Sequence, residues 1–446
     1  MSTVTNAPLK PIYPFDEPGR PIELYRGNIS GLAVNDVDGG VEFRWKPDPT
    51  IVWTIDTGVP PQFVNRQDKI PLVLHRPDGD VELPSYAWGF DGGWSNGTIF
   101  GSDNAPLDRL IAHWFNLPNW HGPELLETTE AGINRQWLGR LTLTVDGWTV
   151  TLDVRPDHPA VWVELNKSDV YVMTHAMEIR RSDGAPFTAC DAEPVLTAMH
   201  CGVSFALGRW VAPMLPVGLN SSGAAVWEEW KAGLCGPARS PSPGWWYQQD
   251  HAALADFLKL LISAFGDPSR RERLWMQMVL AITATYTPGF VEPRITLGFS
   301  GLEHMMWQNL VLSGLMPEAD YEKKNPPVAE KLRRVLNAAK IPVAIDGGIH
   351  PTIAKLAADQ LKYGLKLDGP EAVTWTRNRL IHPTPGKSNR DVYQYPGLLA
   401  EVWLLLRYYL VLLILHSIGY QGTCRDLRKL TGWASSTVTV PWAATS

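Results

Sequence analysis

Hydrophobic and polar residues alternate along much of residues 20 to about 190, and this alternation predicts short β-strands. The segment Gly40–Trp45 alternates residue by residue, and the clearest hairpin is Leu141–Asp153, where Asp146-Gly147 separates two alternating runs. Asp-Gly favours a tight two-residue turn because both residues tolerate positive φ. Many short strands joined by close turns indicate a β-sandwich or a barrel-like domain.

Three shorter segments of this region carry their own expectations. Val161–Leu165 and Val170–Arg180 are predicted as a further pair of strands. Asp108–Phe115 is the one stretch in which the pattern indicates a helix.

The period of the pattern changes after about residue 250, where apolar residues begin to recur every three or four positions. This spacing predicts about seven helices packed as an all-α bundle. They are expected at His251–Phe265, Arg270–Thr285, Leu302–Leu312, Val328–Leu336, Pro351–Tyr363, Pro370–His382 and Leu398–Ile418.

A proline- and serine-rich stretch, Pro237–Gly244, separates the two patterns and is typical of a linker. We therefore predict an α+β chain. A β-rich, sandwich-like N-terminal domain (residues 1–236) with a sensing or regulatory role is followed by a linker (237–250), an all-α domain (251–430) and a tail (431–446).

Composition restricts the function classes. A formal net charge of -6 over 446 residues disfavours a general nucleic-acid coat or a binder of anionic membranes. Four scattered cysteines and the lack of an apolar leader in Met1–Arg20 indicate a cytoplasmic protein. The most apolar run, Val402–Ile418, contains Arg407 and is expected to be a buried bundle helix rather than a membrane span.

Aromatic residues are concentrated in the glycine-rich region 86–120. The members are Trp88, Phe90, Trp94, Phe100, Trp114 and Trp120. Tryptophans are enriched at binding hot spots, so these residues could form a recognition surface for a protein partner. The alternative is a tryptophan-rich core, which we favour.

The residues best suited to chemistry lie on the predicted helix Pro370–His382. Asp368-Gly-Pro370 is a typical helix start, and Pro383 biases His382 away from helical geometry. If the last turn opens, Arg377 can meet His382 although it lies five residues earlier. Asn378 lies four residues before His382 and shares its helix face.

The stretch from Arg377 to Arg390 contains no acidic residue. Its basic members are Arg377, Arg379, His382, Lys387 and Arg390. Arginine offers a fixed fork of donors for phosphate oxygens, and histidine exchanges protons near neutral pH. The pattern indicates metal-free chemistry on a phosphodiester. The alternative is a basic helix end that satisfies carbonyl groups and the helix dipole.

The sequence Arg377-Asn-Arg-Leu-Ile-His-Pro383 resembles the Arg-polar-x-x-x-His signature of HEPN ribonuclease domains, and is most similar to the form found in ApeA-like anti-phage HEPN proteins. Gly301-Leu-Glu303 is similar to the start of an early bundle helix in that family. Pro396–Tyr420 is similar to its long apolar closing helix. The resemblance spans roughly Ala252–Tyr420 and implies that the helical domain is a HEPN bundle.

The resemblance implies a metal-independent endoribonuclease of abortive-infection defence that leaves 2′,3′-cyclic phosphate ends and needs no cofactor. Arg377, Asn378 and His382 would be catalytic, and Arg379, Lys387 and Arg390 would hold the RNA backbone. Glu303 is either a residue that orients Arg377 or a residue that complements a helix dipole. RNA is the expected substrate, with tRNA as one candidate.

The same resemblance implies partners. Two HEPN domains would pair into a homodimer through the helical domain, and a phage protein is a candidate trigger on the N-terminal domain. A membrane partner is not expected. The competing hypothesis is a non-catalytic HEPN-like scaffold whose tryptophan-rich β domain binds a protein partner.

Metal binding has little support in the sequence. His113 and His121 lie eight residues apart with no third ligand at a suitable spacing. The chain has neither a His-Glu-x-x-His motif nor a cluster of cysteine and histidine. No metal site is predicted.

Overall fold

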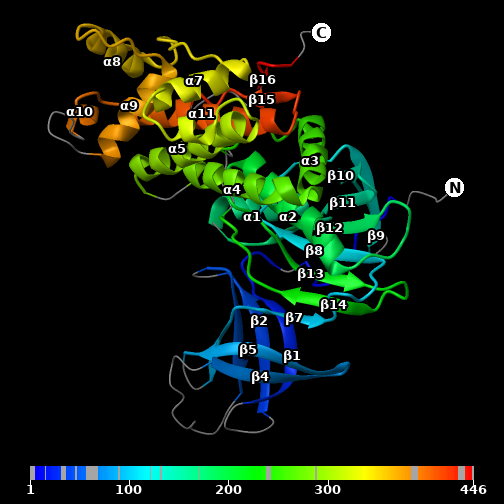
Figure 1. The fold of residues 1–446 in the computed structure, drawn as a ribbon. Helices are drawn as coiled ribbons and strands as arrows, with labels where there is room; N and C mark the ends of the chain where they lie inside the picture. Colours follow the sequence, from blue (N-terminus) through cyan, green and yellow to red (C-terminus); the bar gives the residue numbers. More distant parts are fainter. Residues whose placement is uncertain are drawn as a thin grey trace. The chain divides into compact units, whose positions relative to one another are not determined.

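The computed structural model describes residues 6–15, 17–31, 37–45, 48–56, 69–88, 91–120, 122–130, 133–168, 170–237, 243–286, 289–382, 390–429 and 437–443. A β-rich N-terminal part is followed by a helical C-terminal part, which confirms the predicted α+β class (Figure 1). The chain forms two compact units. The first contains Met1–His200 and Trp210–Pro241, and the second contains Cys201–Arg209 and Ser242–Ser446.

The first unit opens with a closed antiparallel barrel, in the order β1-β2-β3-β6-β5-β4. Its strands are β1 (Ile22–Ser30), β2 (Val37–Arg44), β3 (Thr50–Ile55), β4 (Lys69–Arg76), β5 (Gly79–Ala87) and β6 (Gly92–Ser95). Pairing of Ile29 with Leu74 joins β1 to β4 and closes the barrel. On β4, Ile70, Leu72 and Leu74 alternate inward, as the two-residue period of a strand requires.

The rest of the first unit is built on an eight-stranded antiparallel sheet, in the order β7-β14-β13-β8-β12-β11-β10-β9. Its strands are β7 (Thr98–Gly101), β8 (Arg109–Phe115), β9 (Glu124–Glu130), β10 (Ile133–Val145), β11 (Trp148–Val154), β12 (Met173–Arg181), β13 (Pro213–Leu219) and β14 (Ala225–Trp230). Positive φ at Asp146 and Gly147 confirms the predicted hairpin turn. Two helices, α1 (His158–Ser168) and α2 (Ala189–Leu207), complete the β-rich half of the sequence.

Two local predictions were wrong. Asp108–Phe115, expected to be helical, contains the central strand β8, and its residues from Leu110 onward are buried. A strand buried on both faces shows no alternation, so its apolar run is compatible with a helix. Val161–Leu165, expected to be a strand, lies inside α1.

The second unit is helical. Its elements are α3 (His251–Gly266), α4 (Pro268–Thr285), α5 (Val291–Trp307), the π-helical turn η1 (Gln308–Leu312), α6 (Glu318–Tyr321), α7 (Val328–Ala338), α8 (Pro351–Leu361), α9 (Gly369–Ile381), α10 (Arg390–Tyr393), α11 (Leu398–Ser417), β15 (Thr423–Arg425) and β16 (Thr437–Thr439). Residues 201–209, at the end of α2, also belong to this unit.

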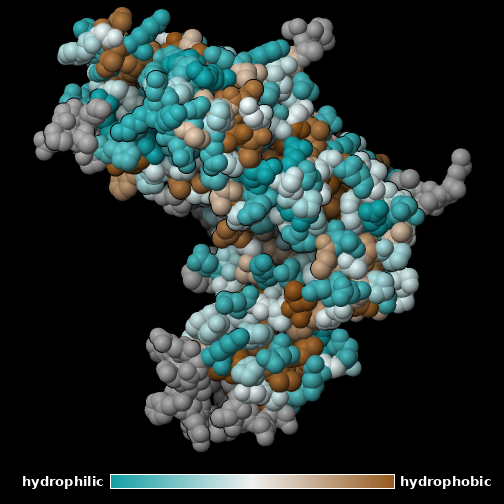
Figure 2. All heavy atoms as spheres, in the orientation of Figure 1, coloured by the Kyte–Doolittle hydropathy of each residue, from teal (hydrophilic) through white to brown (hydrophobic). Residues whose placement is uncertain are grey.

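Helix α11 forms the core of the helical unit, since it is buried almost throughout its length. Within the described residues it is the one helix that is long and apolar enough to cross a membrane. However, 83% of its most apolar window is buried against the rest of the protein. The expected buried bundle helix is therefore confirmed. Over the helical unit, the face drawn in Figure 2 is largely hydrophilic, with scattered hydrophobic side chains.

Candidate functional site

Helix α9 carries the candidate site, and its first turn is fixed by polar contacts. Asp368 caps the helix by accepting a hydrogen bond from the Glu371 amide at 3.0 Å, and Pro370 occupies the first turn. The carboxylate of Asp368 also accepts two hydrogen bonds from Arg333 of α7, at 2.6 and 3.0 Å. These contacts hold α9 against α7 and so position the opposite end of the helix.

The other end of α9 opens at His382, the residue before Pro383. His382 has φ -124° and ψ 69°, outside the helical region, while its amide still donates to Asn378 O. The departure from helical geometry brings the imidazole to Arg377, with 3.2 Å between Arg377 Nη1 and His382 Nε2. A guanidinium can only donate, so His382 Nε2 is the acceptor and Nδ1 carries the ring proton.

Three further groups hold the Arg377 guanidinium. Its carbon lies 4.9 Å from the centre of the Phe299 ring, and Nη2 lies 3.5 Å from a Glu303 carboxylate oxygen. Nη1 also donates to Asn378 Oδ1 at 3.2 Å. Phe299 and Glu303 are four residues apart on α5, so they present one helix face to Arg377.

The three residues predicted as catalytic thus lie together at an exposed helix end. His382 and Asn378 are exposed, whereas the Arg377 side chain is only 20% exposed. Asn378 is hydrogen-bonded to Arg377 through its carbonyl oxygen, which leaves its amide nitrogen available as a donor. The cluster combines a fixed cation, a basic ring nitrogen and a neutral donor, a set that can hold a phosphate and accept a proton.

Arg379 lies apart from this cluster. Its guanidinium stacks on Trp375, with 3.5 Å from the guanidinium carbon to the ring centre, and it forms an ion pair with Asp391 at 3.3 Å. Burial lowers the pKa of Arg379, despite the hydrogen bond to Asp391. These contacts fit a residue that fastens α10 to α9 better than one that holds RNA.

Two predicted RNA-binding residues cannot be placed. Lys387 lies outside the described residues, as does Pro383. Arg390 begins α10, but its side chain is outside the described part of the structure.

No group of three or more histidine, cysteine, aspartate or glutamate side chains is gathered as metal ligands in the described parts of the chain. His113 is fully buried in β8, where its Nδ1 lies within hydrogen-bonding distance of the Met214 and Leu215 carbonyls. Burial lowers the pKa of His113 to about 4, so the ring is neutral and structural. His121 lies outside the described residues.

Comparison with known proteins finds similarity to two domain families. Residues 102–241 match the model of the YopA central domain, and residues 271–438 match that of the YopA C-terminal domain. A Bacillus subtilis (strain 168) protein described as "SPbeta prophage-derived uncharacterized protein YopA" is 25% identical over 307 residues. That match covers 68% of this chain and 66% of the relative, just under two thirds of its length.

No solved structure matches the chain. The candidate site falls in the second of the two matched regions, since α9 lies between residues 271 and 438. The chain therefore contains, in order, regions similar to the YopA central and C-terminal domains.

Proposed function

We propose that the protein is a HEPN-like, metal-independent endoribonuclease with its active site at the C-terminal end of α9. The observation that carries the proposal is the 3.2 Å contact between Arg377 Nη1 and His382 Nε2 at an exposed helix end. Glu303 and Phe299 hold the arginine from α5, so the pair is organised before substrate arrives. Preorganised charge of this kind is the usual source of transition-state stabilisation.

The proposed reaction uses the RNA's own 2′-hydroxyl as nucleophile. His382 Nε2 takes the proton of the 2′-OH, the 2′-oxygen forms a bond to the adjacent phosphorus, and the bond from phosphorus to the 5′-oxygen breaks. Arg377 stabilises the extra negative charge on the phosphorane oxygens, and Asn378 donates to the same group. The leaving 5′-oxygen takes a proton from the imidazolium of a second copy of the site, and a 2′,3′-cyclic phosphate remains.

The second copy makes the active form a homodimer through the helical unit. We place the protein in the cytoplasm, where RNA is the substrate and tRNA is one candidate. The relative's name ties it to a prophage, which accords with a role in conflict between phages and their hosts. We propose abortive-infection defence, with a phage protein as trigger on the β-rich unit.

The decisive experiment incubates purified protein with single-stranded RNA in excess EDTA. The expected products carry 2′,3′-cyclic phosphate ends, and DNA of the same sequence survives because it lacks the nucleophile. Arg377→Ala and His382→Ala should each lower the rate by roughly 100- to 1,000-fold or more.

Stability measurements separate lost chemistry from lost folding. His382→Ala should melt close to the wild type, because exposed helix-end substitutions typically change stability by ~0.5 kcal/mol. Arg377→Ala removes a side chain that is only 20% exposed and contacts Phe299 and Glu303, so it should lose more, about 1 kcal/mol, and still fold. Arg334→Ala is a matched control, since Arg334 is an exposed arginine of the same unit that pairs with Glu330. Cleavage that requires Mg²⁺, or equal cleavage of DNA, would assign the chemistry to another site.

A second candidate function, a non-catalytic scaffold that binds a protein partner, is favoured by one feature of the barrel. Tyr86, Trp94 and Trp88 form a stack, with ring centres 5.3 and 6.2 Å apart and interplanar angles of 18° and 20°. Trp88 is exposed. Trp114, Trp120 and Phe100 are buried instead, so region 86–120 supplies both core and surface, and Phe90 lies outside the described residues.

The two candidate functions differ in which variant fails in cells. If the protein acts as a scaffold, cells that carry His382→Ala resist phage as wild-type cells do, while Trp88→Ala abolishes resistance. If it is a nuclease, His382→Ala abolishes resistance. A plaque assay with the two variants at matched expression decides between them.

A further inference from the structure

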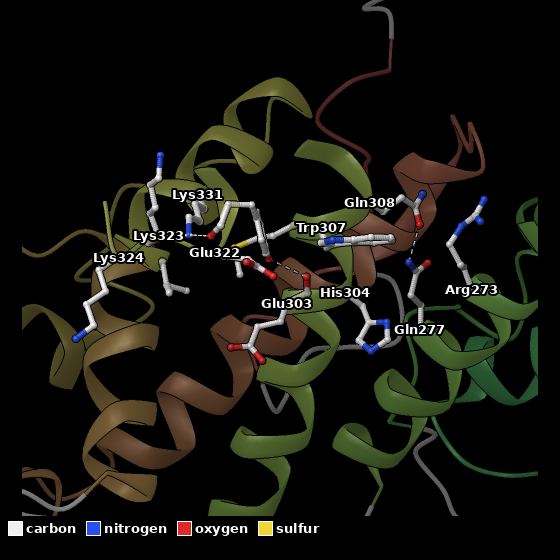
Figure 3. A pocket seen from close by; sticks show the side chains of 13 residues that line it. Arg273, Gln277, Glu303, His304, Trp307, Gln308, Glu322, Lys323, Lys324 and Lys331 are labelled. Carbon is white, nitrogen blue, oxygen red and sulfur yellow. Dashed lines mark hydrogen bonds between the residues drawn. The ribbon is translucent and has the colours of Figure 1, made fainter. Parts of the chain in front are cut away.

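A cavity of about 760 Å³ lies beside the candidate site in the helical unit (Figure 3). Its walls come from α4, α5, η1, the end of α6, the start of α7 and the segment between them. The volume falls in the range of small-molecule sites, roughly 300–1,000 Å³. Glu303 lines the cavity and also contacts Arg377, so the cavity adjoins the catalytic cluster.

One wall of the cavity is aromatic. Trp307 is the last residue of α5, and the π-helical turn η1 follows it directly. Such a turn interrupts the regular spacing of side chains, and π-turns are frequent at functional sites. Trp307 is half-buried beside the cavity and presents a flat apolar surface for stacking (Figure 3).

A pair of amide side chains contributes the polar part of the wall. Gln277 of α4 is 1% exposed and donates through Nε2 to Gln308 Oε1 at 2.6 Å. Its own carbonyl oxygen is buried and has no hydrogen-bond partner among the described residues. A buried acceptor without a donor costs free energy, which a ligand carrying an N–H group would offset. Accepting this hydrogen bond through Oε1 fixes Gln308 and leaves the Gln308 Nε2 group as a second donor.

Cations outnumber anions around the cavity. Arg273, Lys323, Lys324 and Lys331 are opposed by Glu303 and Glu322. Lys331 is buried and donates to the carbonyls of Tyr321 and Lys323, which fixes the segment that carries the other two lysines. Lys323 and Lys324 are exposed at the rim. Lys323 forms an ion pair with Asp320 at 2.6 Å, so a phosphate would meet Lys324 directly and would share Lys323 with Asp320.

We propose that this cavity binds an adenine nucleotide, with the base against Trp307 and the phosphate at the rim lysines. Gln277 Oε1 accepts a hydrogen bond from the 6-amino group, and Gln308 Nε2 donates to a ring nitrogen. Glutamine recognises adenine by this combination of acceptor and donor. A 6-oxo base places an acceptor opposite Gln277 Oε1 and is rejected.

The nucleotide can be free or part of an RNA strand. In the second case the inference rests on the proposed nuclease function and selects RNA with an adenosine beside the cleaved bond. The link is Glu303, which lies between the cavity and Arg377. Base binding in the cavity would then hold the neighbouring phosphate near His382.

The test uses isothermal titration calorimetry on full-length His382→Ala protein, so that cleavage plays no part. The ligands are AMP, IMP, oligoadenylate and oligouridylate. We expect AMP to bind at least about 10-fold more tightly than IMP, or oligoadenylate to bind at least about 10-fold more tightly than oligouridylate, because IMP and oligouridylate lack the 6-amino group. Trp307→Ala should weaken binding about 10-fold or more, because a stacked base depends on the aromatic ring.

Two variants sharpen the measurement. Gln277→Met keeps the side-chain volume but removes the acceptor, so it should abolish the preference for AMP over IMP. Trp275→Ala is the matched control, since Trp275 is an exposed tryptophan on α4 that does not line the cavity. If Gln277→Met fails to fold, Trp307→Ala against Trp275→Ala still tests the site.

Each outcome decides the inference. AMP binding that is lost in Trp307→Ala supports a free nucleotide as ligand, and binding of oligoadenylate alone supports an RNA strand. Absence of binding by both, equal binding of AMP and IMP, or equal losses in Trp307→Ala and Trp275→Ala would overturn the proposal. A protein that binds AMP but never cleaves RNA would overturn only the nuclease function.

Discussion

Glu303 is the residue whose role is easiest to test separately from folding. Its carboxylate lies 3.5 Å from Arg377 Nη2 and is 42% exposed, so the ion pair adds little to stability. We expect Glu303→Gln to lower kcat for RNA cleavage between ~10- and ~100-fold, because a misplaced catalytic group can cost that much. Steady-state kinetics at matched protein concentration measure the change.

A control variant on the same helix shows whether the lost rate comes from the position of Glu303 beside Arg377 or only from the loss of one negative charge on α5. Glu292 also lies on α5, but it accepts a hydrogen bond from Tyr393 and is remote in sequence from the Arg377 contact. Glu292→Gln should leave kcat unchanged, and Glu303→Asp should restore part of the loss. If all three variants cleave at the wild-type rate, Glu303 has no part in positioning Arg377.

His175 makes stability depend on pH. It is fully buried on β12 between the Trp120 and Trp162 rings, and neither ring nitrogen has a partner among the described residues. Burial, with a smaller contribution from His158, lowers the pKa of His175 to about 3. In the unfolded chain the pKa is ~6.5, so only the unfolded state takes up a proton between these values. The stability present above pH ~6.5 is lost as the pH falls towards 3.

The expected loss at about pH 5 is roughly 2 kcal/mol of unfolding free energy from this group. His175→Phe keeps a ring against the two tryptophans and cannot titrate, so its stability should fall less between about pH 7.5 and about pH 5. Denaturant melts at the two pH values measure the slope. If the unfolding free energy of His175→Phe falls with pH as steeply as that of the wild type, other groups set the acid sensitivity. The control variant is His304→Phe, which replaces an exposed histidine.

At this scale the sequence predicted the residues that are near in the chain, whereas Glu303 was the one distant residue that it suggested. The approach of Arg377 to His382 followed from their spacing and from Pro383, because both are local constraints on one helix end. Phe299 was missed although it lies four residues before Glu303, the residue already suspected. The pairing of Arg379 with Asp391 could not be read from the sequence, because it depends on where α10 lies; the stacking of Arg379 on Trp375, four residues earlier on α9, is a local contact that went unnoticed.

At the scale of elements, the packing of α5 on α11 depends on two glycines. A Cβ added at Gly298 would overlap Leu406, and one added at Gly301 would lie 2.7 Å from Leu410 Cδ2. Both leucines are fully buried and have little room to move. The glycines therefore let the helix that carries Glu303 approach the central helix closely.

We expect Gly298→Ala and Gly301→Ala each to destabilise the protein by ~1–3 kcal/mol, the usual cost of overpacking a core. Without such contacts, alanine in place of glycine stabilises a helix by up to ~1 kcal/mol. Gly266→Ala supplies that control, because Gly266 ends α3 with nothing near its added methyl group. Urea denaturation measures the free energy of unfolding of all three variants. An unchanged value in Gly298→Ala would show that α5 and α11 are not closely packed at this position.

Whether a segment is a helix or a strand was predictable where its hydrophobic residues recur at a regular spacing and one of its faces meets solvent. The Asp146-Gly147 hairpin and the amphipathic helix α7 satisfy this condition. Helix α11 is buried almost throughout, and its length rather than its period distinguished it from a strand. Strand β8 does not satisfy the condition, because a short buried segment has the same apolar composition in either conformation. Helix α1 does expose one face, but the run Val161–Leu165 is too short to show a helical period by itself. The closed barrel depends on pairing between β1 and β4, which no local pattern encodes.

At the scale of the whole molecule, the proposed nuclease requires two copies. A composite cleft makes the rate depend on the fraction of dimers that contain two intact copies. In a 1:1 mixture of wild type with His382→Ala, free exchange should leave about a quarter of the wild-type rate, whereas independent sites would leave about half. Light scattering at the assay concentration establishes the mass. A rate of one half from a proven dimer would contradict the composite cleft.

The end of α2 has a consequence for how the protein is made. Residues Cys201–Arg209 belong to the helical unit, where Phe205 packs against Trp245 and Phe257 with ring centres 6.2 and 5.8 Å apart. The chain then returns to the first unit for β13 and β14. During synthesis a nine-residue piece of the helical core therefore leaves the ribosome before the last strands of the sheet, and the helices that cover it are synthesised afterwards.

A single cut in the chain therefore cannot yield a complete helical unit free of sheet residues. A fragment of residues 242–446 lacks Phe205 and should expose Trp245 and Phe257, bind a hydrophobic dye and aggregate on warming. A synthetic peptide of residues 199–210 should bind that fragment and suppress dye binding, while a scrambled peptide should not. The helical unit would then behave as a split protein whose missing piece can be supplied from outside, which offers a chemical means of controlling when it folds.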